Sequence, residues 1–114
     1  MSTIFSKIIN KEIPADIVFE SDTVLAFKDI NPQAPVHILI IPKIEIPKVS
    51  DIKGEEHAKL LGELFDAANK IAKEMNINED GFRLVFNNGS NAGQEVYHLH
   101  MHLLGGRRMK WPPG

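Results

Sequence analysis

The chain has 114 residues, of which 43% are hydrophobic and 25% charged, and its net charge is −2 with neutral histidines. This length and composition predict one compact domain over residues 1–114. The charge provides no broad basic surface, so neither nucleic acid nor an anionic membrane is an expected partner. The absence of cysteine excludes disulfides and thiolate metal sites, and no secretory or membrane-spanning pattern is present, which makes the cytoplasm the expected compartment.

Short apolar stretches dominate the first 42 residues. Apolar side chains at helical spacing indicate a short helix over residues 3–10, with Ser2 or Thr3 as the candidate N-cap. Residues 31–35 are expected to form a loop, because their two prolines fix φ and remove backbone donors. Apolar runs bounded by turn residues predict three strands, which cover residues 17–20, 23–29 and 36–42.

A long helix is the clearest element of the second half, since residues 55–75 carry one apolar stripe and a polar opposite face. A fourth strand is predicted over 82–87, a glycine-rich loop over 88–93 and a fifth strand over 96–104. Strands joined mostly by short loops favour an antiparallel arrangement. The predicted fold is α+β: a five-stranded antiparallel sheet with one long helix on one face and a short N-terminal helix. The other face must stay open or find a partner.

Three of the five histidines, His98, His100 and His102, lie within five residues of the predicted fifth strand. Because side chains alternate between the two faces of a strand, the three imidazoles are expected to share one face. The alternate side chains are expected to pack beneath the long helix: Tyr97, Leu99, Met101 and Leu103.

A zinc site and a catalytic site are the two functional interpretations of this cluster. Neighbouring imidazoles can share one ion, with His37 or a carboxylate as a further ligand. Three histidines along a straight strand span about 13 Å, however, which is too far for one ion without a bulge. Imidazole is a good nucleophile near neutral pH, and the glycine-rich loop can bring backbone N–H groups close to an anion. The pattern therefore favours catalysis at a phosphate, with no bound metal.

The segment from Gly93 to Gly106 resembles the signature of the histidine triad (HIT) family, His-x-His-x-His-x-x with apolar x. The similarity extends over nearly the whole chain, including residues 3–15 and 27–43. The final Trp-Pro-Pro-Gly of residues 111–114 is typical of the Hint branch of that family, the purine nucleoside phosphoramidases. The resemblance implies a homodimer in which the two sheets join into one continuous sheet.

The resemblance also implies a reaction that needs no cofactor. Purine nucleoside 5′-monophosphoramidates, including aminoacyl adenylates, would be hydrolysed to AMP or GMP. By this similarity His100 is the nucleophile and forms a nucleotidyl-histidine, while His102 contacts the phosphate and the leaving group. His98 and His37 are expected to form a relay that orients the nucleophile.

Further substrate-binding positions follow from the same resemblance. Asp29 and Ile30 are expected to hold the ribose. The purine pocket is expected to consist of Phe5, Ile8, Ile13, Phe27 and Leu39. The phosphate is expected to lie against Asn87, Gly93, Gln94 and Glu95. Further substrate-binding positions are His100, Met101 and His102. Trp111, in the C-terminal tail, is expected to shape the site of the partner protomer.

Glu95 departs from the family pattern, in which this position often carries Ser or Thr. An ionised carboxylate cannot donate a hydrogen bond, and it repels a phosphate a few ångströms away. Glu95 either turns away and leaves a slower site, or it recruits a cationic leaving amine.

Two alternative functions share some of these features. Dinucleoside polyphosphate hydrolases also carry the three histidines, and a non-catalytic nucleotide-binding or scaffold protein needs no intact nucleophile. His102, which nucleotidyltransferases of the superfamily typically replace by Gln, favours a hydrolase, and the tail favours the phosphoramidase branch.

Two features are assigned no function. His57, at the start of the long helix, matches no motif and is expected at the surface. The basic run over residues 107–110 is too short for a nucleic-acid patch and is expected to be a solvated segment.

Overall fold

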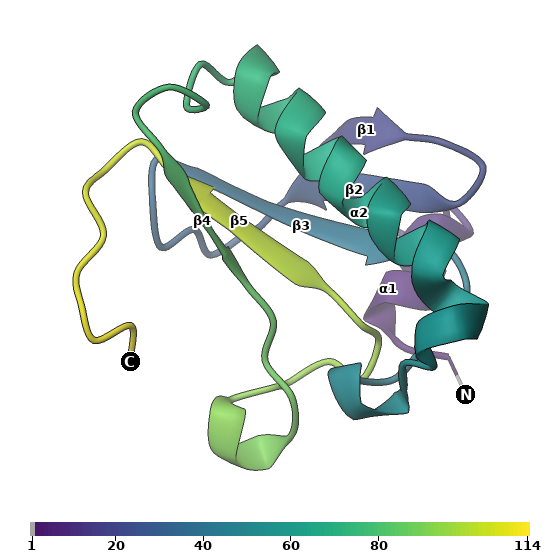
Figure 1. Ribbon diagram of the computed structural model, residues 1–114. Coiled ribbons are helices and arrows are strands. Elements are labelled where there is room, and N and C mark those ends of the chain that lie inside the picture. Colours follow the sequence, from purple (N-terminus) through teal and green to yellow (C-terminus); the bar gives the residue numbers. More distant parts are fainter. Residues whose placement is uncertain (1) are drawn as a thin grey trace.

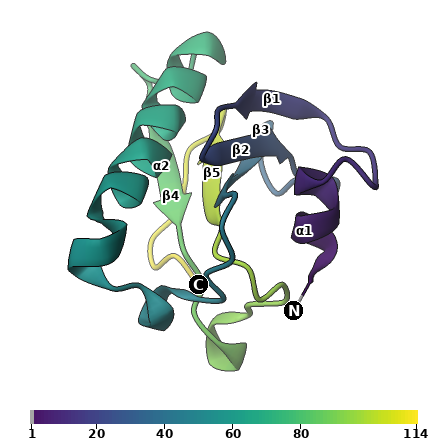
Figure 2. The ribbon, with the colours of Figure 1, turned by 90° about the vertical axis from the view of Figure 1, so that its right-hand side faces the viewer.

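The computed structural model describes residues 2–114, which form a five-stranded antiparallel sheet with one helix on each face (Figures 1 and 2). The strands lie in the spatial order β1-β2-β3-β5-β4, and each neighbouring pair is antiparallel. The α+β prediction is therefore confirmed. The strands are β1 (Ile17–Glu20), β2 (Val24–Lys28), β3 (Val36–Pro42), β4 (Phe82–Val85) and β5 (Met101–Gly105). The helices are α1 (Ile4–Ile9) and α2 (Gly54–Glu74), with 3-10 turns η1 (Val49–Asp51) and η2 (Ser90–Ala92).

Both helices form close to their predicted bounds. Thr3 caps α1, since its hydroxyl accepts the backbone N–H groups of Phe5 and Ser6, and the Ser6 hydroxyl accepts the N–H of Thr3 in return. This capping box satisfies amides that the first turn leaves without helical partners. Among the described residues, no helix combines the length and the apolar character that a membrane crossing requires.

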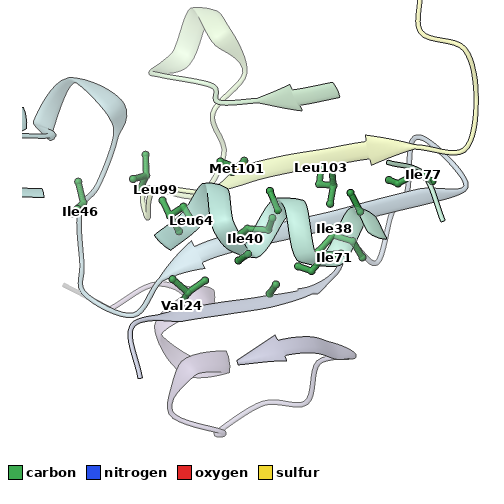
Figure 3. Packing of buried hydrophobic residues seen from close by; sticks show 14 residues of the cluster. Val24, Ile38, Ile40, Ile46, Leu64, Ile71, Ile77, Leu99, Met101 and Leu103 are labelled. Atoms are coloured by element: carbon green, nitrogen blue, oxygen red, sulfur yellow. The ribbon is translucent and has the colours of Figure 1, made fainter. Parts of the chain in front are cut away.

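The apolar stripe of α2 packs against one face of the sheet (Figure 3). We call this packing the α2-side core. Alternation along the strands supplies it, because every second side chain of β2, β3 and β5 points toward the helix. The side chains labelled in Figure 3 are Val24, Ile38, Ile40, Ile46, Leu64, Ile71, Ile77, Leu99, Met101 and Leu103.

The short helix α1 covers part of the opposite face, as Figure 2 shows. The intervening side chains of β2 and β3 pack there against α1, so both strands are buried on two sides. This corrects the expectation that the face away from the long helix stays open or waits for a partner. We call this second group the α1-side cluster: Phe5, Ile8, Leu25, Phe27, Leu39 and Ile41.

The fifth strand is shorter than predicted, because β5 begins at Met101 rather than at residue 96. Its ladder with β3 starts where Met101 faces Ile40, and two residues further along β3 lies Pro42, which has no N–H to donate. The carbonyl of Pro42 accepts a bond from the His98 ring at 2.7 Å instead. Tyr97, which strand alternation assigned to the core, is consequently 45% exposed.

Candidate active site

Four histidines meet on the α1 side of the sheet. His102 lies in β5 and His37 at the start of β3, while His98 and His100 belong to the irregular segment that leads into β5. The ring centroids of His100 and His102 are 5.0 Å apart, and those of His37 and His102 are 5.2 Å apart. The three histidines of the sequence cluster thus share a face, and His37, which was also expected in the site, lies beside them.

The ring of His100 is held in one tautomer. Its Nδ1 lies 2.7 Å from the backbone carbonyl of His98, which can only accept, so Nδ1 carries the proton and Nε2 has a free lone pair. Phe5 packs against this ring nearly perpendicularly, at 5.1 Å between centroids. Burial lowers the pKa of His100, which keeps the imidazole neutral at pH 7. A buried, neutral imidazole with a bare nitrogen suits a nucleophile.

The ring of His37 is held in the other tautomer. The backbone N–H of Gln33 donates to His37 Nδ1 at 3.0 Å, so the proton of His37 lies on Nε2. This N–H faces His102 Nδ1 at 2.9 Å and Asp29 Oδ2 at 3.4 Å. Burial lowers the pKa of His37 as well, although Asp29 opposes the shift. His37 is therefore a neutral donor toward His102.

His102 takes its own tautomer from His37. Since its Nδ1 accepts the His37 N–H, its proton lies on Nε2. Burial lowers the pKa of His102 to about 4, and the proximity of His100 and His37 adds to this shift. At pH 7 the side chain is consequently a neutral hydrogen-bond donor rather than a source of protons.

Nε2 of His102 is buried and finds no hydrogen-bond partner among residues 2–114. A buried donor without a partner is costly, and such groups are rare in folded proteins. An acceptor atom of a ligand bound next to His100 would satisfy it. The N–H of His102 is therefore available to a hydrogen-bond acceptor of a bound ligand.

His98 has a different role from its two neighbours. Its Nε2 donates to the Pro42 carbonyl, and its own carbonyl accepts from His100, so the backbone of His98 rather than its ring is hydrogen-bonded to His100. The expected relay of His98 and His37 is thus divided, because the His98 carbonyl orients His100 while His37 contacts His102.

Asp29, His37 and His102 bring three possible metal-ligand atoms within 4.8 Å of one another. The hydrogen bonds described above do not fit an ion there. His37 Nε2 carries a proton as long as Nδ1 accepts the Gln33 amide, so this nitrogen has no lone pair for a metal. An ion would force the proton onto Nδ1, where it would face the Gln33 N–H.

The glycine-rich loop is closed on itself by internal hydrogen bonds. Gly93 has φ 83° and Gly89 has φ 85°, conformations that favour glycine. The amides of Gly93 and Gln94 donate to the carbonyls of Ser90 and Gly89. These two amides are therefore already used within the loop, although they were expected near the phosphate.

Gln94 is buried, and its side chain is fully engaged. Its Oε1 accepts the Gly89 amide at 2.8 Å, and its Nε2 donates to the carbonyls of Pro47 and Val96 at 2.9 and 3.1 Å. The side chain thus fixes the loop to the β3–α2 connection rather than offering free donors to a substrate. Glu95, the next residue, is exposed.

The residues expected in the purine pocket pack together, and four of them belong to the α1-side cluster. Ile13 is half-buried at its edge. The side chains of this cluster pack between α1 and the sheet (Figure 2). The four cluster members of the expected pocket are Phe5, Ile8, Phe27 and Leu39.

The other expected residues are distributed differently. Asp29 Oδ1 accepts the Asn31 N–H at 2.8 Å, and Ile30 beside it is almost fully exposed. Asn87 is half-buried just after β4. The Met101 side chain is completely buried in the α2-side core, on the face opposite the histidines, so only its backbone is available to a substrate. Trp111 is 82% exposed on the tail.

Sequence reasoning missed Gln33 and misplaced His57. Gln33 acts through its backbone amide, which no residue type reveals. His57 was expected at the surface, yet its Nδ1 accepts the N–H of Lys53 at 2.9 Å and its Nε2 lies 3.2 Å from a Glu56 oxygen. Lys53 is the N-cap of α2, and its side chain makes no capping hydrogen bond. The His57 ring instead accepts a backbone N–H at the start of the helix.

Comparisons with known proteins agree on one family. The model of the HIT domain matches residues 10–109. The purine nucleoside phosphoramidase of Escherichia coli is 60% identical over 105 residues, which cover 92% of this chain and 87% of that protein. The adenylylsulfatase HINT1 of Arabidopsis thaliana is 55% identical over 113 residues, 98% of this chain and 76% of that protein. The crystal structure of a HIT family hydrolase from Legionella pneumophila has a TM-score of 0.96 at 51% identity, covering 99% and 100% of the two chains.

Proposed function

The chain belongs to the HIT domain family, and we propose that it hydrolyses purine nucleoside 5′-monophosphoramidates to the nucleoside monophosphate. The observation that carries this proposal is the pairing of a bare nitrogen with a free donor. His100 Nε2 has a lone pair, and the adjacent His102 has a buried N–H without a protein partner among residues 2–114. A phosphoryl group between them would meet a nucleophile and a donor together.

In the proposed first step, His100 Nε2 bonds to phosphorus while the P–N bond of the substrate breaks. The electron pair of that bond stays on the leaving nitrogen, which takes a proton from water. The positive charge that develops on His100 is shared with Nδ1–H, whose bond to the His98 carbonyl strengthens as the ring becomes cationic. In the second step, the oxygen of that water attacks phosphorus, releases the monophosphate and restores neutral His100.

His102 is proposed to donate a hydrogen bond from Nε2 to the phosphoryl group or the leaving nitrogen. Its pKa of about 4 argues against transfer of a proton from this neutral ring at pH 7. A fixed donor at such a position contributes roughly 3 kcal/mol to the stabilisation of developing charge. Asp29 and Ile30 are proposed to hold the ribose at the exposed end of β2.

A homodimer is part of the proposal. β4 is an edge strand that pairs only with β5 within residues 2–114, so its other side can pair with β4 of a second copy. The tail contacts β4 at one point, where the Lys110 carbonyl accepts a bond from Arg83 at 3.0 Å. We propose that Trp111 reaches the partner's site, and that the enzyme is cytoplasmic, as its lack of cysteine permits.

Adenylyl sulfate is a second candidate substrate, because a relative of 55% identity is named an adenylylsulfatase. The same attack of His100 on phosphorus would then release sulfate. Sulfate leaves without a proton, so the relative kcat/KM for the two substrates tests how much protonation of the leaving group limits the reaction.

Single-turnover hydrolysis of adenosine 5′-phosphoramidate tests the proposal. Wild type should release AMP through a protein-bound nucleotide, and H100A should lose both the bound nucleotide and at least about a thousandfold in rate. H57Q is the matched control, since it changes an imidazole outside the site and should retain the wild-type rate. Near wild-type hydrolysis by H100A would overturn the assignment of the nucleophile.

A further inference from the structure

The turn after β5 contacts the proline loop that precedes β3. Arg107 Nε donates to the Gln33 carbonyl at 3.1 Å, and its Nη1 donates to the Arg108 carbonyl at 3.2 Å. Gly106 lies so close to this loop that a Cβ on it would be 2.9 Å from the Pro35 Cβ. The guanidinium therefore bridges two backbone carbonyls at a place where two segments already touch.

Gln33 connects this turn to the histidines. While its carbonyl accepts from Arg107, its amide donates to His37 Nδ1 at 3.0 Å. Its side-chain Nε2 donates to the Asn31 carbonyl at 3.1 Å, and the Asn31 amide donates to Asp29 Oδ1 at 2.8 Å. A series of hydrogen bonds thus connects His102 through His37 and Gln33 to Arg107.

The orientation of the Gln33 amide matters because a neutral imidazole has two tautomers of similar energy. An N–H aimed at His37 Nδ1 selects the tautomer with the proton on Nε2. This proton then faces His102 and requires His102 to keep its own proton on Nε2. If the loop rotated away, both rings could exchange tautomers, and the N–H of His102 would no longer point at the substrate.

We propose that Arg107 is a positioning residue for the hydrolysis, which holds the Gln33 segment so that its amide fixes the tautomers of His37 and His102. The expected effect of Arg107 on the rate of hydrolysis rests on the proposed function. Its effect on the two imidazoles does not depend on any activity. An arginine suits this task because its planar guanidinium offers several donors in a fixed geometry and always carries its charge.

Arg108 provides a matched control for a test of this role. Both arginines are exposed, carry the same charge and line the same cavity of about 380 Å³, which also includes Asp80 and Gly106. Of the two arginines, it is Arg107 that donates a hydrogen bond to the Gln33 carbonyl. R107A, R107K and R108A are therefore compared with wild type by ¹⁵N NMR of the imidazoles without substrate, and by single-turnover and steady-state kinetics.

In wild type and R108A, we expect His37 and His102 to carry their protons on Nε2. R107A should show a mixture of tautomers at both rings and a fall in kcat of about two- to tenfold, the equivalent of one hydrogen bond, with KM unchanged. R107K, which keeps a charged donor, should recover part of both losses.

Three outcomes would overturn the inference: unchanged tautomers in R107A, equal losses in R107A and R108A, or a rise in KM alone. Equal losses would show a general effect of charge, and a rise in KM alone would show a contact with substrate. If wild type proved inactive toward every phosphoramidate, the proposed function would fail, while the NMR comparison would still decide the role of Arg107.

Discussion

At the scale of the residue, the direction of each hydrogen bond decides what an imidazole can do. The His98 carbonyl gives His100 a bare Nε2, and the Gln33 amide gives His102 a protonated Nε2 by way of His37. Two histidines two positions apart in the chain thus face the same space with opposite properties. Because burial lowers the pKa of each, both remain neutral at pH 7.

Stability at acid pH follows from these pKa values. An unfolded histidine has a pKa near 6.5, whereas His102 in the folded protein has one of about 4, so the unfolded chain binds more protons between these values. We expect the free energy of unfolding from urea titrations to be level above pH 6.5 and to fall progressively toward pH 4. H102Q, which lacks the imidazole but keeps the carboxylates, should show a shallower fall. Identical slopes for the two proteins would contradict this origin.

The lowered pKa of His100, the proposed nucleophile, predicts how activity changes at acid pH. His100 should remain unprotonated as the pH drops through 6.5, so the single-turnover rate should stay constant there and decline only at lower pH. Rapid-quench measurements at a series of pH values check this. A rate already halved at pH 6.5 would indicate an ordinary, solvated imidazole.

Glu95 provides a test of charge near the phosphate. Since like charges a few ångströms apart repel by about 1 kcal/mol in water, E95S should raise kcat/KM for a substrate with a neutral leaving amine about fivefold. The exposed Glu55 on α2 gives a control, and E55S should leave kcat/KM unchanged. Equal or lower activity of E95S would dismiss repulsion as the effect of this carboxylate.

At the scale of the element, the sequence predicts regular structure well where one pattern dominates. The predicted strands over 17–20 and 36–42 have the bounds of β1 and β3, and the predicted helix over 55–75 is displaced by one residue from α2. The start of the fifth strand is predicted wrongly, because the groups that decide it are far away in the sequence. Pro42 ends the ladder between β3 and β5, and the Ile46 carbonyl accepts the Leu99 amide at 2.6 Å. Alternation of polar and apolar side chains cannot reveal such contacts.

The packing of α2 is tested by truncating Leu64, which is completely buried in the α2-side core. L64A should lower the free energy of unfolding by about 2–5 kcal/mol, the usual cost of a cavity left by a deleted leucine. K59A, on the exposed face of the same helix, should change it by less than about 0.5 kcal/mol. Both are measured by urea denaturation, and similar values for the two variants would contradict the packing described here.

The site is less predictable than the fold, for a related reason. The shared face of His98, His100 and His102 follows from spacing alone, and its resemblance to a family suggested which of them attacks. The tautomers, however, depend on the backbone amide of Gln33 and the backbone carbonyl of His98, and the residue type does not reveal what such a group bonds to. The side-chain amide of Gln94 likewise makes three hydrogen bonds only because the fold brings Gly89, Pro47 and Val96 close to it.

At the scale of the whole molecule, the β4 edge of the sheet and the C-terminal tail both offer an exposed surface. β4 has one side without a partner strand among residues 2–114, and Trp111, which follows the Lys110 carbonyl bonded to Arg83 of β4, is largely exposed. Exposed large aromatic side chains near an unpaired strand edge are typical of a surface that another chain covers. The proposed dimer would cover both features at once.

A mixing experiment tests the dimer and the tail together. A chain truncated after Lys110 should form dimers by sedimentation but lose activity about tenfold or more, because no tail reaches either site. H100A has a tail but no nucleophile. Mixed and allowed to exchange, the two should regain activity above the sum of the separate samples, since one site then has both parts. Sedimentation as a monomer, or a purely additive rate after exchange, would refute the proposed reach of the tail.

The division between the irregular segment and β5 has a consequence for engineering. The His100 ring is held by the His98 carbonyl in the irregular segment, while His102 lies in β5 and its partner His37 is fixed by the Gln33 amide of a different loop. The two imidazoles that are proposed to act on the substrate thus have separate supports, and each can be displaced by mutating its own support. Because the Ile46 carbonyl accepts the Leu99 amide next to His100, substitutions over residues 43–47 would shift His100, and substitutions over residues 31–35 would alter the bond that fixes His37. Selection for a new leaving group can therefore act on one loop while the nucleophile stays in place.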